Sequence, residues 1–318
     1  MAVVVMDKSS LIFKEIDGNL SIDENTAVNW NHYFHIGSCA KLFLAVRAGK
    51  AVEEGKVDWA TKFFNIFPEW KSVANEKYLN ITLENLLACR GGIQSYTSGE
   101  EEYPEVDNKK EFGKYLIKQA PHPKKEKGGF SYLYSNASYT LASLMLEKVT
   151  ATSYKKMIKE LIEDRLKLSC KFGWPKSIGD NQPTGHFVEN GQPDPASNYD
   201  YNLNSLTESA GDISMKPMDF AEYTQFYLRG ISGQNEYIEK ETYEHINYRY
   251  DGFSLGICNG TFKNHEILNI DGSAGTFYTR LMIFPALDLA YVILINSGSE
   301  KAVDALSEEV ESNYLKSW

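Results

Sequence analysis

The order of predicted elements indicates an α+β protein whose antiparallel sheet is built from both chain ends. Two short β-like runs open the chain, a block rich in helix signals fills its middle, and four β-like runs followed by one helix close it. Pairing between the two terminal groups of strands accounts for this order, with helices flanking the sheet. We therefore expect residues 1–55 and 205–318 to form an α/β sheet domain and residues 56–204 a mainly helical domain, with the active site between them.

The first half of the chain carries clear start and stop signals. Residues 2–6 and 11–16 are apolar runs separated by a polar turn, which predicts an opening hairpin. An apolar run predicts a helix from residue 38 to about Gly55, where the glycine is a plausible stop. In the middle block, Thr82 is placed to cap a helix over residues 83–88, and Ser135 or Asn136 to cap one over residues 139–149. Residues 155–168 have an apolar side typical of a surface helix.

The second half changes from an irregular segment to strands. Residues 170–204 are dense in Pro, Gly and Asn, which predicts a long surface crossing. Pro217 begins a helix that Gly230 ends. The predicted strands then cover residues 253–258, 266–270, 276–284 and 289–295, with turns at Asn259-Gly260 and Pro285-Ala286. An amphipathic helix over residues 300–315 closes the chain.

Composition narrows the class of protein. The chain has 318 residues, 42% of them hydrophobic, which is enough for a large core. The net charge of −10 argues against a nucleic-acid partner. No apolar stretch approaches the roughly 20 residues that span a bilayer, and the first residues lack the pattern of a signal peptide. The oligomeric state and the compartment stay open.

Cysteine and histidine spacing predicts neither a metal site nor a cofactor. No two of the four cysteines are spaced as C-x-x-C, and the histidines show no zinc-ligand spacing. Scattered buried thiols are the expected state, and the cysteines are Cys39, Cys89, Cys170 and Cys258.

The strongest chemical signal is Ser38-Cys39-Ala40-Lys41 at the start of the first predicted helix. Residues three apart lie on one helix face, so the Lys41 amine, when neutral, can take the proton of the Ser38 hydroxyl. This pattern would make Ser38 a nucleophile that needs no histidine. Ser153 and Lys156 have the same spacing, so the pattern alone does not choose between the two serines.

A second serine pattern competes with this interpretation. Residues 252–256 match G-x-S-x-G, which in a nucleophile elbow joins a strand to a helix. Here a turn follows Ser254, and the only downstream histidine is His265. We interpret Ser254 as a small residue in a strand.

Five segments in one order resemble the serine β-lactamase and penicillin-binding protein superfamily, most of all its class C branch, which also includes relatives among DD-peptidases and family VIII esterases. Tyr134-Ser135-Asn136 is similar to the Y-x-N element of that branch, whereas Tyr78-Leu79-Asn80 has the same spacing outside that order. The resemblance covers nearly the whole chain and selects Ser38 over Ser153. The matching segments are residues 34–41, 81–93, 134–139, 209–221 and 276–315.

The resemblance implies a role for each matched residue. Ser38 would attack a carbonyl and become acylated, with Lys41 and Tyr134 as general base and acid. The adjacent ammonium would shift the pKa of the Tyr134 phenol. Asn136 would hold a substrate amide or the Lys41 side chain. The N–H groups of Ser38 and of a residue near Ser273 would form the oxyanion hole.

The third motif departs from the family. K-T-G or H-x-G is usual there, but this chain has Ile270-Asp271-Gly272. Gly272 keeps the glycine that lets a substrate approach, whereas Asp271 would repel a substrate carboxylate. We expect the substrate to be a small molecule or a peptide. Among esters, amides, peptides and β-lactams, a neutral or cationic ester, amide or peptide is favoured. Esterase or amidase activity is thus favoured over efficient β-lactamase activity.

Two other interpretations remain open at this stage. The chain can be a penicillin-binding or sensor protein that acylates without turnover, or a non-catalytic binding module on the same fold.

Overall fold

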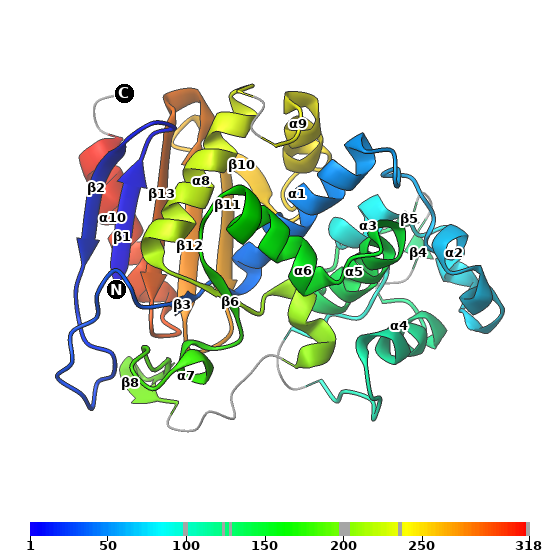
Figure 1. The fold of residues 1–318 in the computed structure, drawn as a ribbon, viewed down its shortest axis with the longest axis horizontal. Helices are drawn as coiled ribbons and strands as arrows, with labels where there is room; N and C mark the ends of the chain where they lie inside the picture. The colour runs from blue at the N-terminus through cyan, green and yellow to red at the C-terminus, as the bar shows by residue number, and fades with distance from the viewer. Residues whose placement is uncertain (98–100, 123–124, 127–128, 197–203, 235–236, 316–318) are drawn as a thin grey trace.

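The computed structural model describes residues 1–97, 101–122, 125–126, 129–196, 204–234 and 237–315. Its main feature is a six-stranded antiparallel sheet with the strand order β10-β11-β12-β13-β1-β2 (Figure 1). The strands are β1 (Ala2–Met6), β2 (Leu11–Ile16), β10 (Cys258–Phe262), β11 (His265–Ser273), β12 (Tyr278–Phe284) and β13 (Leu289–Ile295). Strand β1 pairs with β13 along its whole length. The prediction of a sheet built from both chain ends is therefore confirmed.

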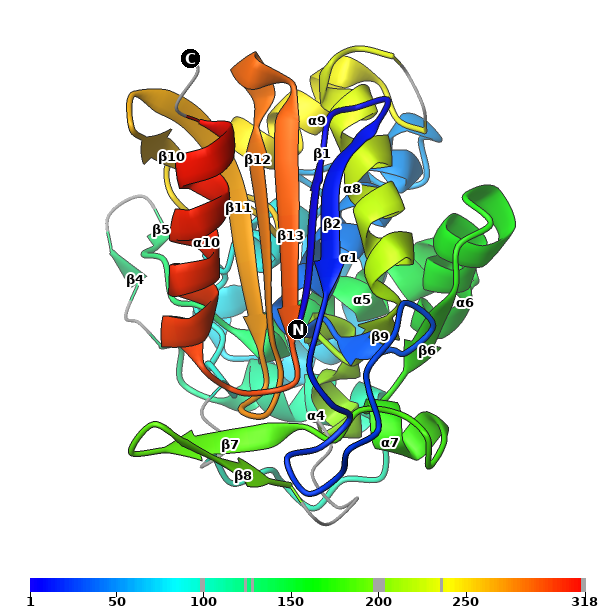
Figure 2. The same cartoon turned by 90° about the vertical axis from the view of Figure 1, so that its left-hand side faces the viewer.

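Helices cover both faces of this sheet. Side chains alternate between the faces of β1, so Val4 joins the main core while Val3 and Val5 pack beside α10 (Glu300–Tyr314). Figure 2 shows α10 on one face of the sheet and α8 (Pro217–Ile231) on the other. Helix α1 (Ala40–Glu53) lies on the α8 side and carries the predicted nucleophile segment into the main core.

The middle of the chain is mainly helical and lies at the other end of the molecule in Figure 1. Residues 137–146 of helix α5 are buried in this block, and Ser135 caps the helix by accepting a hydrogen bond from the Ser138 N–H. Thr82 caps α3 in a reciprocal arrangement with Asn85, as the sequence predicts. The helices are α2 (Phe63–Ile66), α3 (Leu83–Leu87), α4 (Lys109–Lys118), α5 (Asn136–Thr150) and α6 (Tyr154–Lys159), which continues into a π-helical turn at Glu160–Arg165.

The segment predicted as a plain crossing, residues 170–204, contains regular structure, which corrects that prediction. It holds β6 (Cys170–Phe172), the short helix α7 (Pro175–Ile178) and a hairpin of β7 (His186–Glu189) and β8 (Gln192–Pro195). Residues 197–203 lie outside the described part of the chain. Strand β6 pairs with β9 (Ile213–Met215), which also pairs with β3 (Phe34–His35) just before Ser38. Pairing with distant strands gives order to a sequence whose local signals favour irregular structure.

The strand predicted over residues 253–258 is also misplaced. Residues 253–257 form a loop, and β10 begins at Cys258. The turn to β11 falls at Lys263 and Asn264, which have positive φ angles, and not at Asn259-Gly260. Helix α9 (Lys240–Tyr248), which the sequence did not reveal, precedes this loop. Strands β4 (Lys125–Glu126) and β5 (Gly129–Phe130) form a short antiparallel pair.

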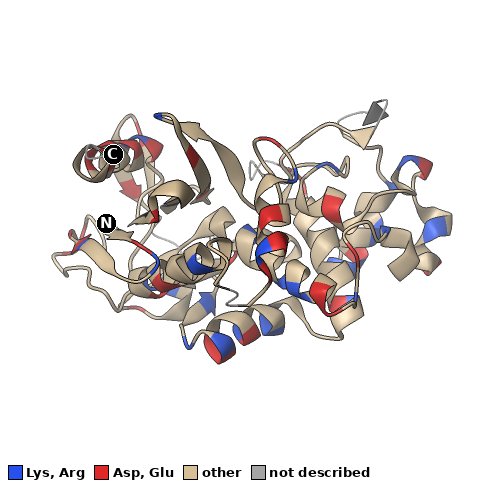
Figure 3. Cartoon of the chain, turned by 90° about the horizontal axis from the view of Figure 1, so that it is seen from above, with Lys and Arg blue, Asp and Glu red and all other residues tan. Residues whose placement is uncertain are grey.

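Charged residues of both signs lie along the helices of the molecule. Figure 3 shows basic and acidic residues interspersed along the helices. In the described part of the chain, no helix has the length and apolar character needed to cross a bilayer.

Candidate active site

Ser38 lies in a single 3-10 turn (Gly37–Cys39) that leads directly into α1, and Lys41 follows one turn later. The Lys41 ammonium nitrogen lies 3.0 Å from the Ser38 hydroxyl oxygen. Ser38 is partly exposed, whereas Lys41 has no exposed surface at all. The helix therefore presents the hydroxyl to solvent while it holds the amine inside the protein.

Burial determines the protonation of Lys41. Loss of hydration lowers the pKa of the Lys41 amine to about 7, because no described carboxylate accompanies the amine into the core. Its nitrogen donates to the Ala210 carbonyl at 2.7 Å and to the Asn136 side-chain oxygen at 2.8 Å. A neutral amine has two hydrogens, and these two oxygens accept both of them. The remaining lone pair is then available to the Ser38 hydroxyl.

The start of α5 brings Tyr134 and Asn136 to the same place. The Asn136 amide nitrogen donates to the Tyr96 carbonyl at 2.9 Å, which leaves its oxygen for Lys41. The Lys41 nitrogen lies 4.7 Å from the centre of the Tyr134 ring. The Lys41 side chain is thus one partner of Asn136, as one of the two alternatives for this residue predicts.

The pKa of Tyr134 is shifted by a cause other than the adjacent ammonium that the sequence suggested. Burial raises the pKa of the phenol above its ordinary value, and a hydrogen bond with Ser38 offsets this only in part. The phenol is therefore protonated at neutral pH. A protonated phenol beside the Ser38 hydroxyl is suited to donate a proton.

The competing patterns lack this arrangement. Ser153 and Lys156 are both exposed, and the Ser153 side chain makes no capping hydrogen bond. Tyr78 is buried and donates to the Gly92 carbonyl. Ser254 is fully buried in the loop that leads into β10, so the geometry of a nucleophile elbow is not present there.

Strand β11 passes directly against the turn that holds Ser38. A β-carbon on Gly272 would come within 2.0 Å of the Ile36 carbonyl oxygen and 2.8 Å of the Ser38 nitrogen. Only glycine permits this contact, which explains on steric grounds why residue 272 has no side chain. The close approach brings the backbone of Ser273 beside that of Ser38, as an oxyanion hole formed by their N–H groups would require.

Asp271 does not have the surroundings that we expected. The Arg280 guanidinium binds its carboxylate with two hydrogen bonds of 2.8 and 2.6 Å, and the Tyr278 hydroxyl donates a third. Arg280 also bonds to Asp304 of α10. Because side chains alternate along a strand, Asp271 points toward α10 when Gly272 faces the Ser38 turn. The expected repulsion between Asp271 and a substrate carboxylate is therefore wrong, since Arg280 neutralises the charge.

Two groups at the site were not found from the sequence. The Ala210 carbonyl is a backbone acceptor, which no side-chain motif can reveal. The other is His35, which accepts a hydrogen bond from the Gly37 N–H at 3.2 Å and packs on Trp174 with ring centres 3.8 Å apart. His35 thereby supports the turn before Ser38. Its position three residues before the serine was the only available signal.

The described residues contain no group of three or more His, Cys, Asp or Glu side chains placed to hold a metal ion. The polar groups around Ser38 are an amine, a phenol, an amide and backbone groups. These groups are suited to moving a proton and binding a carbonyl.

The helices and antiparallel sheet that carry this Ser-x-x-Lys pair define the β-lactamase/transpeptidase fold. The chain belongs to the β-lactamase family, whose model matches residues 1–312.

Individual relatives are distant. The protein flp of Staphylococcus aureus (strain N315) is 20% identical over 316 residues, and the match covers 97% of this chain but 62% of flp. A class C β-lactamase from Rhodobacter sphaeroides has a TM-score of 0.74 at 17% identity, with 94% of this chain and 90% of that chain covered. A D-amino acid amidase from Ochrobactrum anthropi SV3 has a TM-score of 0.74 at 17% identity, covering 93% and 85%. These structures share the fold with this chain.

Proposed function

We propose that this protein is a serine hydrolase that forms an acyl-enzyme on Ser38. One observation carries the proposal: the Lys41 amine is fully buried, has a pKa of about 7 and lies 3.0 Å from the Ser38 hydroxyl oxygen. An amine with this pKa is partly neutral at neutral pH and serves as a general base. Lys156, which has the same spacing to Ser153, is exposed and lacks the burial that lowers the pKa of Lys41.

The reaction uses the neighbouring groups in sequence. Lys41 takes the proton of Ser38 as the hydroxyl oxygen attacks the substrate carbonyl carbon. The N–H groups of Ser38 and Ser273 stabilise the resulting oxyanion. Tyr134 donates a proton to the leaving alcohol or amine as its bond to carbon breaks. Water then attacks the acyl-enzyme and gives a proton to the Tyr134 phenolate, while Lys41 returns its proton to the Ser38 oxygen as the ester bond breaks and the acid is released.

The preferred substrate is an ester or amide that does not depend on a carboxylate for binding. Where the family usually has lysine or histidine, Ile270 offers no charge, and the nearby Arg280 is engaged by Asp271 and Asp304. Strand β11 contains no Lys or Arg, and this supports the preference for a substrate without a carboxylate. Repulsion by Asp271 no longer supports it. The shared fold with the D-amino acid amidase agrees with an amide or ester substrate.

The test compares turnover and covalent labelling. We expect hydrolysis of p-nitrophenyl acetate, weak hydrolysis of nitrocefin, and a single fluorophosphonate adduct located on Ser38 by intact mass and peptide mapping. Ser38→Ala should remove the adduct and lower turnover by a factor on the order of 10⁴. Ser153→Ala is the matched control, because Ser153 has the same spacing to a lysine but is exposed, and it should change neither readout.

The other outcomes separate the competing functions. A stable adduct on Ser38 without turnover of any ester or amide would indicate a protein that acylates without turnover. Labelling of Ser254, or turnover that survives Ser38→Ala, would overturn the assignment. Efficient nitrocefin hydrolysis without esterase activity would contradict the substrate preference.

A further inference from the structure

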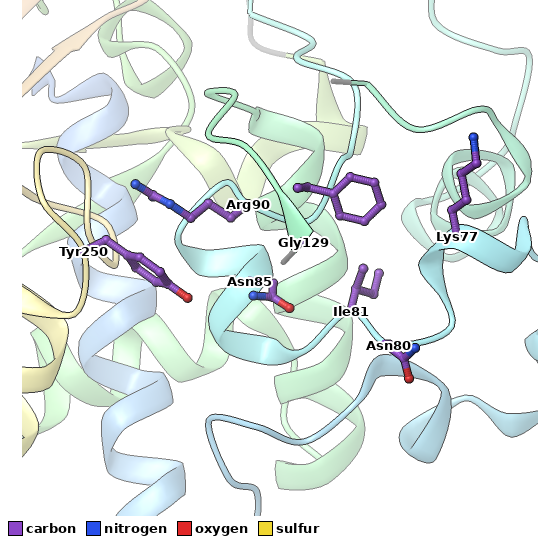
Figure 4. A pocket seen from close by; sticks show the side chains of 8 residues that line it. Lys77, Asn80, Ile81, Asn85, Arg90, Gly129 and Tyr250 are labelled. Atoms are coloured by element: carbon purple, nitrogen blue, oxygen red, sulfur yellow. The ribbon is translucent and has the colours of Figure 1, made fainter. Parts of the chain in front are cut away.

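A hollow of about 440 Å³ lies outside the Ser38 site. Its walls come from the helical block, from strand β5 and from the loop after α9. Figure 4 shows Arg90 and Tyr250 on one side, Lys77 on the opposite side, and Asn85 and Ile81 between them. No acidic side chain lines this pocket in the described part of the chain.

Arg90 is held rigidly without a carboxylate partner. One guanidinium nitrogen donates to the carbonyls of Ala88 at 3.1 Å and Phe253 at 2.9 Å. The guanidinium carbon lies 4.3 Å from the centre of the Tyr250 ring and 5.3 Å from that of Tyr132. Among the described residues no acidic side chain pairs with it, so its charge is positioned but not neutralised.

The two asparagine side chains of the pocket have their acceptor oxygens engaged elsewhere. The Asn85 oxygen accepts from the Thr82 N–H at 3.1 Å in the cap of α3. The Asn80 oxygen accepts from the Lys62 ammonium at 2.9 Å. Each amide therefore has one acceptor position of its oxygen occupied, and its NH₂ group can donate to a ligand. The Lys77 side chain, exposed and without a described partner, adds a further donor.

The nearby carboxylate of Glu84 is already neutralised. Burial acts to raise its pKa, but the hydrogen bonds that it accepts from His245, Arg249 and Tyr250 together outweigh burial and lower the pKa to about 2. The pocket thus offers hydrogen-bond donors and two free positive charges, in a molecule whose net charge is −10. Such a site favours ligands that carry acceptors and negative charge.

We propose that this pocket binds an organic anion through a carboxylate or phosphate group. Arg90 and the Asn85 amide would hold the charged group, while Lys77 on the opposite side would attract it at longer range (Figure 4). Ile81 and Phe130 would contact an apolar part of the same molecule. Arg90 bonds to Phe253, whose ring packs edge-on against Tyr134 with centres 5.5 Å apart. Phe253 therefore connects Arg90 of the pocket to Tyr134 of the Ser38 site. Binding here does not require that Ser38 be a nucleophile.

The test measures binding and not turnover, so its result is independent of the proposed hydrolase activity. Benzoate and phenyl phosphate are titrated into the full chain by calorimetry at fixed ionic strength, with neutral benzamide as a matched ligand. We expect benzoate, phenyl phosphate or both to bind saturably, and benzamide to bind at least about tenfold more weakly. Binding of one anion and not the other would identify the charged group that the pocket accepts.

Variants locate the binding. Arg90→Gln should abolish it, and Lys77→Gln and Lys77→Glu should weaken it progressively. Lys71→Gln is the control, because Lys71 is equally exposed but lies outside the pocket. Lys77 has no described side-chain partner, so its variants remain informative if Arg90→Gln does not fold. Equal binding of benzamide and benzoate, or unchanged anion affinity in Lys77→Glu, would overturn the proposal.

Discussion

At the scale of single residues, Lys41 shows how burial turns an ordinary side chain into a base. Its pKa of about 7 results from desolvation in a position without exposed surface. The neutral form is present above this pKa and is lost as the pH falls through it. With a pKa near 7, about one tenth of the amine is neutral at pH 6 and about nine tenths at pH 8.

Activity should follow the neutral fraction of Lys41. We expect kcat/KM for p-nitrophenyl acetate to rise about tenfold between pH 6 and pH 8, because kcat/KM reports ionisation in the free enzyme. The rates are measured in buffers of constant ionic strength, and the background of Ser38→Ala is subtracted at each pH. A flat profile over this range, or a rate that falls as the pH rises, would rule out Lys41 as the base.

The residue scale also shows what a motif omits. Ser38, Lys41, Tyr134 and Asn136 could be predicted to lie together because their spacing and order match a family pattern. The partners of Asp271 could not, since its neutralisation depends on Arg280 of the next strand and on the face of the sheet that it occupies. A sequence gives the charge of a residue, whereas its effect depends on neighbours that only the fold supplies.

At the scale of elements, the contact between β11 and the Ser38 turn requires that residue 272 be glycine, which has no side chain. A β-carbon at position 272 would overlap the Ile36 carbonyl, so Gly272→Ala must push the strand away from the turn. We expect a loss of about 1–3 kcal/mol in the free energy of unfolding and at least a tenfold loss in kcat/KM, as the Ser273 N–H moves from its place. Denaturant unfolding and ester turnover measure the two effects.

The same sheet offers a matched control for this substitution. Gly260 lies in β10, where an added β-carbon would meet only the Ile267 side chain at 4.0 Å. Gly260→Ala should therefore change stability by less than about 0.5 kcal/mol and leave activity intact. Equal effects at both positions would mean that the close approach of β11 to Ser38 is not required.

The boundaries of strand β10 were predicted poorly because residues typical of a turn make other contacts in the fold. Asn259-Gly260 is typical of a hairpin turn, yet both residues lie in β10. The Asn259 amide instead donates to the carbonyls of Asn247 and Tyr250, which ties the strand to the end of α9. The turn forms at Lys263 and Asn264, where pairing of β10 with β11 requires it. Tertiary contacts, and not the Asn-Gly dipeptide, therefore determine where the turn between β10 and β11 lies.

At the scale of the whole molecule, one core connects the sheet and the helical block. Buried residues as far apart as Val4, Phe34, Leu86, Leu141 and Leu268 belong to a single contiguous cluster. The two-domain division predicted from the sequence places a boundary near residues 55 and 205, and Ser38 and Tyr134 come from opposite sides of it. Because the core is shared, unfolding of either domain alone would expose apolar surface of the other and so raise the free energy of partial unfolding.

We therefore expect the chain to unfold in one cooperative transition despite its 318 residues. Trp70 is buried in the helical block, so tryptophan fluorescence reports partly on that region. Trp70→Phe identifies its contribution, and far-UV circular dichroism follows the molecule as a whole. The two guanidinium unfolding curves should coincide, because loss of the helical block would expose the apolar face of α1 and its neighbours. A fluorescence transition that precedes the dichroism transition would instead show that residues 56–204 unfold as an independent domain.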